Sequence, residues 1–285
     1  MTQTVSASKV PKPPTRASRD DGYGRSSRFY QVETELGLIQ AFPSVTTVLS
    51  CIGKPALIGW AAREERTLVS EAAADLYLDS PETPKMARAG FLSSLEDRLG
   101  KTRAHQRQLK KAGEIGTAVH AVVEWQMRKD LGQEVGACPS LPVEGQAAFA
   151  AFQTWRDSVK LKPLMIEQTV WSKKYGFAGT MDWLEEMDLA GDRVVVVGDW
   201  KTSKGLYPES NLQNAAYCAA LIEMGHLDDF SGGRIVRLPK SKDDPGFEEK
   251  LISPEQQRED FQVFLHVLEL WKWQEKQEQA RKGGI

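Results

Sequence analysis

Asp182, Asp199 and Lys201 have the residue types and spacing of a hydrolytic metal site. Asp182 ends one predicted strand, Asp199 ends the next, and Lys201 follows two positions later. Alternate side chains of a strand face the same side, so Asp199 and Lys201 are expected to share a site, and a hairpin would bring Asp182 beside them. Such a site suits metal-dependent phosphodiester cleavage, because carboxylates bind Mg²⁺ and a lysine can orient or deprotonate the attacking water. The alternative, and the usual case for an isolated Asp-x-Lys pattern, is that Asp182 and Asp199 are acids of turns and that Lys201 is a solvated lysine at a strand end.

A predicted helix from Gly113 to about Leu131 offers one more metal ligand. Gly116, His120 and Glu124 lie four residues apart, which places them on one helix face. The His120 imidazole could complete a metal shell. The alternatives are a half-buried histidine with satisfied hydrogen bonds and a surface or salt-bridged Glu124.

Three further residues flank the acids and the lysine. Glu167 lies on the strand before Asp182, where it could be a distal metal ligand or one acid of a charged network. Gln213 and Tyr217 are four residues apart on the helix after Lys201. Glutamine can hold a phosphate or a water, and tyrosine can stack on a base. The alternatives are solvent exposure for Gln213 and core packing for Tyr217.

A basic stretch over residues 98–111 includes Arg107, Lys110 and Lys111. It could bind phosphates, since each such contact releases counterions. A solvated helix face is an equally good interpretation. With a net charge of −2, the whole chain is not a basic nucleic-acid-binding protein, so any binding of DNA must use local positive surface.

The order of predicted elements favours a mixed α/β or α+β fold. A hairpin over 29–39 and a helix over 55–78 come first, and the β-branched stretch 43–49 reads as strand or helix entry. The later elements are helices 113–131 and 143–159, strands 164–171, 177–186 and 193–200, helix 209–224, strand 233–238 and helix 254–276. Three regions are expected: a flexible basic arm (1–28), a hairpin and helical region (29–112) and a core (113–285).

Composition excludes several classes of protein. The chain has 285 residues, 41% hydrophobic and 27% charged, and no apolar run of membrane-spanning length. Cys51, Cys138 and Cys218 lack metal-ribbon spacing, which argues against a zinc ribbon, a Cys-ligated cluster or a disulfide framework and favours a reducing compartment. We expect a cytoplasmic protein, since Asp20 and Asp21 and the early prolines disfavour a mitochondrial transit peptide.

Taken in order, these motifs resemble the PD-(D/E)XK nuclease superfamily, specifically its RecB-like branch. The resemblance runs from Gly116-x-x-x-His120 through Glu167, Gly179-x-x-Asp182 and Asp199-x-Lys201 to Gln213-x-x-x-Tyr217. The stretches 43–49 and 199–203 are also similar to the mitochondrial genome maintenance exonuclease and its phage and bacterial relatives. Each motif is weak alone, and the specificity comes from their order.

The resemblance implies a restriction-endonuclease-like core with Mg²⁺ or Mn²⁺ and no iron-sulfur cluster. By position, it makes His120, Asp182 and Asp199 metal ligands and Lys201 the catalytic lysine. Gln213 and Tyr217 would position that lysine and contact DNA, and Glu167 would support the site. Asp199 stands where many relatives have Glu.

The implied activity is that of an exonuclease on single-stranded DNA ends, in replication, recombination or repair. The helices before Gly113 would then form an arch or wall that admits the strand. The alternatives are an endonuclease of the same fold, used in recombination, packaging or restriction, or a non-catalytic nucleic-acid-binding protein. A recruiting protein partner stays unidentified, and a membrane partner is not expected.

Overall fold

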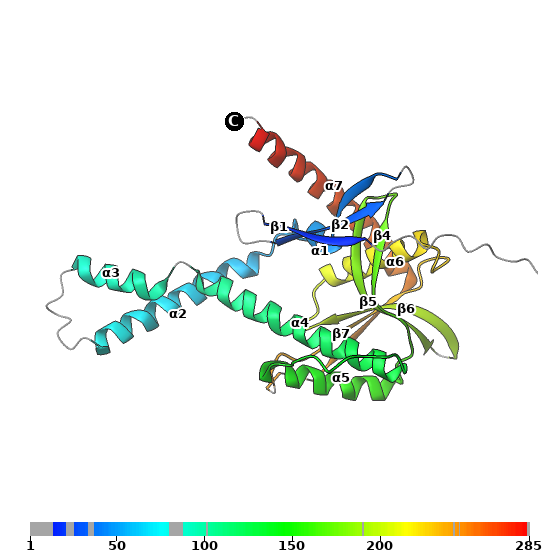
Figure 1. Ribbon diagram of the computed structural model, residues 1–285, viewed down its shortest axis with the longest axis horizontal. Helices are drawn as coiled ribbons and strands as arrows, with labels where there is room; N and C mark the ends of the chain where they lie inside the picture. The colour runs from blue at the N-terminus through cyan, green and yellow to red at the C-terminus, as the bar shows by residue number, and fades with distance from the viewer. Residues whose placement is uncertain are drawn as a thin grey trace, which may run out of the picture. The chain divides into compact units, whose positions relative to one another are not determined.

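A five-stranded mixed sheet lies at the centre of the larger part of the chain (Figure 1). In this computed structural model the order is β4-β5-β6-β7-β8, with β6 and β7 parallel and the other neighbours antiparallel. The strands are β4 (Pro163–Ser172), β5 (Phe177–Leu189), β6 (Asp192–Lys201), β7 (Gly233–Arg237) and β8 (Glu248–Ile252). The structure describes residues 14–20, 26–33, 37–79, 88–100, 102–189, 191–241, 243–244 and 246–283. The mixed α/β class predicted from the sequence is confirmed.

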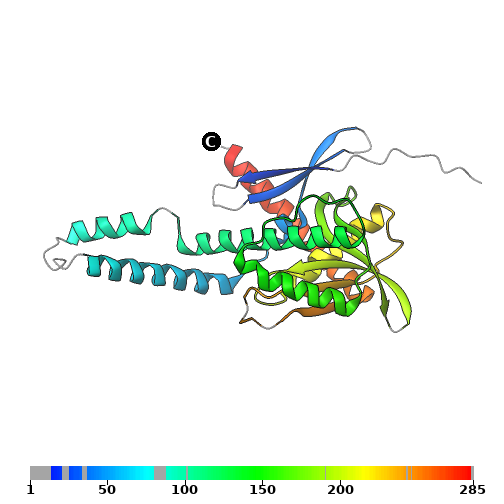
Figure 2. The same cartoon turned by 60° about the horizontal axis from the view of Figure 1, so that its bottom comes forward.

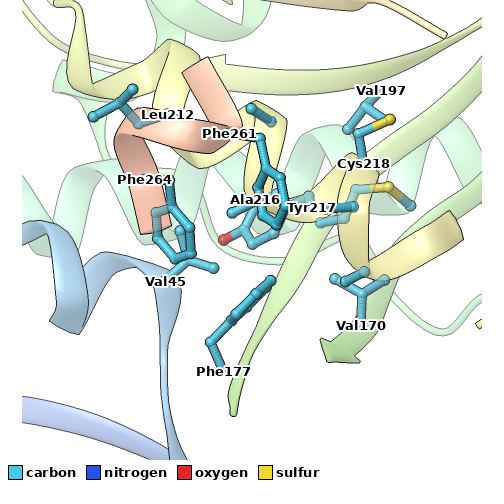
Figure 3. Close-up of a cluster of buried hydrophobic side chains, with 14 of the residues drawn as sticks. Val45, Val170, Phe177, Val197, Leu212, Ala216, Tyr217, Cys218, Phe261 and Phe264 are labelled. Atoms are coloured by element: carbon cyan, nitrogen blue, oxygen red, sulfur yellow. The ribbon is translucent and has the colours of Figure 1, made fainter. Parts of the chain in front are cut away.

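Helices cover both faces of this sheet. Helix α5 (Gln146–Val159) follows a short 3-10 turn (Val143–Gly145). Helix α6 (Glu209–Glu223) connects β6 to β7, because two parallel strands need a crossover connection. Helix α7 (Pro254–Gly283) packs on α6. The side-chain alternation of β6 sends Val197 toward α6 and α7, into a core that also contains Phe177, Phe261 and Phe264 (Figure 3). Asp199, two residues beyond Val197, shares that side of β6.

A cluster of aromatic rings fills the opposite face, against α5. Trp183 and Trp200 stack with ring centroids 3.9 Å apart, and Trp155 meets the Trp200 ring edge-on at 5.0 Å. The stack needs a glycine at position 198, because a Cβ there would lie 1.8 Å from Trp183 Cε2. This packing fixes the strand that carries Asp199 and Lys201.

A three-stranded antiparallel sheet precedes the central one. It contains β1 (Thr15–Asp20), β2 (Ser26–Glu33) and β3 (Ile39–Pro43), followed by the short helix α1 (Val45–Leu49). The predicted 29–39 hairpin is present as β2 and β3, with Gly37 at a φ of +73° between them. The predicted flexible arm (1–28) lies partly outside the described residues, and its described part includes β1.

The chain divides into two compact units, Gly53–Val119 and the remainder. The smaller unit contains α2 (Pro55–Asp79), α3 (Arg88–Leu99), which packs along α2, and the first part of α4 (Ala104–Asp130) (Figure 2). The division falls at other positions than the predicted boundaries at 28 and 112. Ser44, just after β3, bridges to Ala178 of β5, and the second boundary lies within α4. None of the described helices is both long and apolar enough to cross a bilayer.

Candidate functional site

The site forms where β5 and β6 separate. Their ladder runs from Leu189–Asp192 at the turn to Trp183–Gly198 and stops there. Asp182 is the next residue of β5, and its Oδ2 accepts a hydrogen bond of 2.7 Å from the backbone N–H of Trp200. A side-chain carboxylate thus takes the place of a backbone partner at the end of the ladder. The two acids are brought together at this opening.

Asp199, Lys201 and Gln213 form a closed hydrogen-bonded group. Lys201 Nζ donates to Asp199 Oδ1 at 2.8 Å and to Gln213 Oε1 at 3.1 Å, while Gln213 Nε2 donates to the same Asp199 oxygen at 2.8 Å. Gln213 therefore contacts both Asp199 and Lys201 of β6. Its side chain is not simply exposed to solvent, which was one of the two interpretations of the sequence. Burial raises the pKa of Asp199 to about 6, an effect that the Lys201 charge opposes and the nearby Asp182 charge reinforces.

Tyr217, one helical turn after Gln213, is buried in the core. Its hydroxyl lies 3.4 Å from Gln213 Nε2, and its ring fills the space where a Cβ of Gly179 would lie, 2.5 Å from Tyr217 Cε1. Burial, followed by the charges of Asp199 and Asp182, holds its pKa well above the usual value. The ring of Tyr217 is therefore a core residue, as the core-packing interpretation holds. Its hydroxyl lies behind Gln213, which contacts Lys201.

His120 meets Asp182 from α4. Its Nδ1 lies 3.4 Å from Asp182 Oδ1. Burial disfavours the charged imidazole, but the Asp182 charge and hydrogen bond outweigh it and raise the pKa of His120 to about 9. For Asp182, burial likewise favours the neutral form, but the facing His120 charge prevails and lowers the pKa. Without a metal, the two therefore form an ion pair.

Glu167 lies closer to this pair than the sequence indicates. Among the described residues, His120, Glu167 and Asp182 can offer three ligand atoms that all lie within 4.8 Å of one another. Glu167 has a left-handed backbone, with a φ of +48°, which is costly for a residue with a Cβ. Burial and then the Asp182 charge raise the pKa of Glu167 to about 8.

Arg128 is a contributor that the sequence patterns did not single out. Its Nη2 donates to the carbonyl of Ile166 at 3.1 Å, next to Glu167, and its Nε forms a 2.8 Å ion pair with Glu124. The salt-bridged interpretation of Glu124 is therefore the one that the geometry supports. The spacing of Arg128, four residues after Glu124 and eight after His120, could have indicated this role.

The predicted phosphate-binding residues lie in the smaller unit, on α4. Arg107 Nη1 donates to the carbonyl of Thr102 at 2.6 Å. Lys110 is exposed, with its Nζ 4.0 Å from Glu114, and Lys111 is exposed on the same helix. These observations fit the solvated-face interpretation as well as a role in DNA binding.

The donor set fits a divalent metal ion. Asp199 Oδ2 is buried and makes no hydrogen bond within the described part of the chain, although Lys201 Nζ lies 2.6 Å away. The His120 imidazole and the carboxylates of Asp182 and Glu167 provide oxygen and nitrogen donors that such ions take, and Asp199 is not in this group. The Lys201 ammonium already balances the charge of the Asp199 carboxylate, so the fit to a metal ion depends on His120, Glu167 and Asp182.

A mixed sheet whose diverging central strands carry two acids and a lysine, flanked by helices, is the architecture of a metal-dependent nuclease. The family model of the PD-(D/E)XK nuclease superfamily matches residues 88–282, and the chain belongs to that superfamily. No curated protein matches the sequence significantly. Membership indicates a metal-dependent nuclease with DNA as its substrate.

Proposed function

We propose that this protein is an exonuclease of the RecB-like branch that shortens DNA from single-stranded ends. The supporting observation is the closed group of Asp199, Lys201 and Gln213 beside the Asp182–His120 pair, at the opening between β5 and β6. The order of sequence motifs adds the resemblance to that branch. The setting we propose is replication, recombination or repair in the cytoplasm of a bacterial cell or a phage-infected host.

In the proposed mechanism, His120, Asp182 and Asp199 hold the ion, and Glu167 is a further candidate ligand because of its distance to the first two. A divalent ion supplies positive charge to the phosphoryl oxygens and lowers the pKa of water. Lys201 orients the attacking water and offsets the negative charge that develops at phosphorus. The water oxygen forms a new bond to phosphorus and releases a proton to solvent, while the bond to the leaving sugar oxygen breaks and that oxygen takes a proton from solvent.

Gln213 positions the lysine in this scheme. Lys201 is a flexible side chain with three donors, and the two acceptors Asp199 Oδ1 and Gln213 Oε1 restrict it to one direction. Held in this direction, the ammonium group can meet the water or the phosphate at the same place in each turnover. We further propose that the helical unit of Gly53–Val119 guides the strand, with Arg107, Lys110 and Lys111 as phosphate contacts.

Digestion of end-labelled linear strands, with a covalently closed single-stranded circle alongside, tests the function. With Mg²⁺ or Mn²⁺ the linear strand should be degraded from an end and the circle should stay intact. Lys201→Ala and Asp199→Ala should abolish degradation, whereas Lys272→Ala, at an exposed lysine paired with Glu269, should not. Cleavage of the circle would make the protein an endonuclease, and full activity in the Lys201 variant would refute the site.

A further inference from the structure

A hydroxyl cluster joins β2 to the start of α1. Ser44 Oγ accepts from the backbone N–H of Thr47 at 3.0 Å and donates to Thr47 Oγ1 at 2.9 Å. Thr47 Oγ1 in turn accepts from the backbone N–H of Arg28 at 2.9 Å and donates to its carbonyl at 3.2 Å. The hydroxyls of Ser44 and Thr47 are therefore fully used in holding α1 against β2.

Thr46 and the Arg28 side chain are not used in that way. Arg28 Nη2 donates to Thr46 Oγ1 at 2.7 Å, and Ser44 Oγ lies 3.0 Å from the same oxygen. Both residues are only half-buried, and no carboxylate of the described residues forms an ion pair with Arg28. A guanidinium has five N–H donors in a planar fork that suits an anion with two oxygens. Within the described part of the chain, the Arg28 guanidinium is therefore a fork of donors with no carboxylate paired to it.

The cluster adjoins the strand that carries Asp182. Ser44 bridges to Ala178 of β5, and the hydroxyl of Tyr30 lies 3.0 Å from Thr180 Oγ1. Thr180 precedes Asp182 by two residues, about 7 Å along a strand. Arg28, whose backbone is hydrogen-bonded to Thr47 of this cluster, therefore lies beside the strand that carries Asp182.

We propose that Arg28 and Thr46 form a phosphate-binding subsite for the DNA strand whose scissile bond lies at Asp182 and Asp199. The ligand is a phosphate of the strand, either an internal phosphodiester or a terminal phosphate. A strand carries one phosphate per nucleotide, so a strand engaged at Asp182 presents its neighbouring phosphates along this side of β5. This inference rests on the proposed nuclease function and adds a residue pair that determines how the strand is held.

Binding of a fluorescein-labelled oligothymidylate in EDTA, which prevents cleavage, tests the subsite over a series of salt concentrations. Arg28→Ala should weaken binding about tenfold, as loss of a charged hydrogen bond does, and should reduce the slope of log K against log salt by about 0.7. Arg28→Lys should keep that slope with lower affinity, because it retains the charge without the fork. Thr46→Val should weaken binding a few-fold without changing the slope.

Arg193→Ala is the matched control, because this exposed arginine lies at the turn end of β6, opposite Asp188 and away from the site. Repeating the measurement with a 5′-phosphorylated strand, a 5′-hydroxyl strand and a circle identifies the phosphate. A defect on the circle indicates an internal phosphodiester, and a defect confined to the phosphorylated end indicates a terminal phosphate.

Unchanged affinity and slope in Arg28→Ala and Arg28→Lys would overturn the proposal and leave Arg28 as a structural tie between β2 and α1. Thermal unfolding identifies a variant that fails to fold; if Arg28→Ala does, Arg28→Lys and Thr46→Val decide. The proposed function fails separately, when the wild-type chain binds strands in EDTA but does not shorten them with metal.

Discussion

Replacing Gln213 with Ala is expected to lower kcat much more than it changes KM. The substitution removes the 3.1 Å acceptor of Lys201 and the 2.8 Å donor to Asp199 Oδ1, while leaving both charged residues in place. A hydrogen bond to a charged group contributes about 1.5–3 kcal/mol. If that energy serves to orient Lys201 in the transition state, kcat falls about 10- to 100-fold.

Single-turnover cleavage of an end-labelled strand measures this effect, with KM from the strand-concentration dependence and Tm as the stability readout. Gln256→Ala is the matched control, because Gln256 also donates an amide hydrogen bond to a carboxylate, Asp260, at 3.2 Å on α7. Gln213→Glu should be at least as slow as Gln213→Ala, because it places a second acid against Asp199. An unchanged kcat in Gln213→Ala would show that Gln213 does not position Lys201. A loss that appears wholly in KM would show that Gln213 binds DNA instead.

Further predictions concern the metal and the fold. Because a ligating imidazole must lose its proton, affinity for Mn²⁺ should increase as pH rises toward the His120 pKa of about 9, with proton release in calorimetry; a flat profile from pH 6 to 9 would contradict this. In the metal-free protein, protonated His120 stabilises the fold through its ion pair with Asp182. This stabilisation is complete below a pH of about 6.5, the pKa in the unfolded chain, and is lost as pH rises through about 9. Thermal unfolding in EDTA as a function of pH should show the loss. Gly198→Ala should destabilise the protein by about 3 kcal/mol in urea unfolding, because its Cβ would overlap the Trp183 ring; stability equal to the wild type would show that the stack can shift.

Sequence periodicity was sufficient to group Asp199 with Lys201 and Gln213 with Tyr217. Strand and helix periods are local, so residues two apart in a strand and four apart in a helix share a side wherever the element lies. The helix predicted over 254–276 is also present, and at its start Ser253 Oγ accepts from the backbone N–H of Gln256 at 3.2 Å. These parts of the site depend on neighbours in the chain.

Other features depend on residues far apart in sequence, which the local patterns cannot report. The packing of the Trp183 ring over Gly198, at the last rung of the β5–β6 ladder, is one such feature. The left-handed backbone of Glu167 brings that acid to His120, although its sequence context reads as ordinary strand. Strand β8 (Glu248–Ile252) was missed because its charged, mostly exposed residues lack an apolar period.

The residues of the site come from separate parts of the chain, which affects when the site can form during synthesis. His120, Asp182, Lys201 and Gln213 come from four different elements, α4, β5, β6 and α6. Contacts between segments so distant in sequence carry a loop-closure cost and complete late in folding. A nascent chain on the ribosome therefore lacks the assembled centre until α6 has been synthesised and docked. The hydrolytic centre is therefore among the last parts of this protein to become complete.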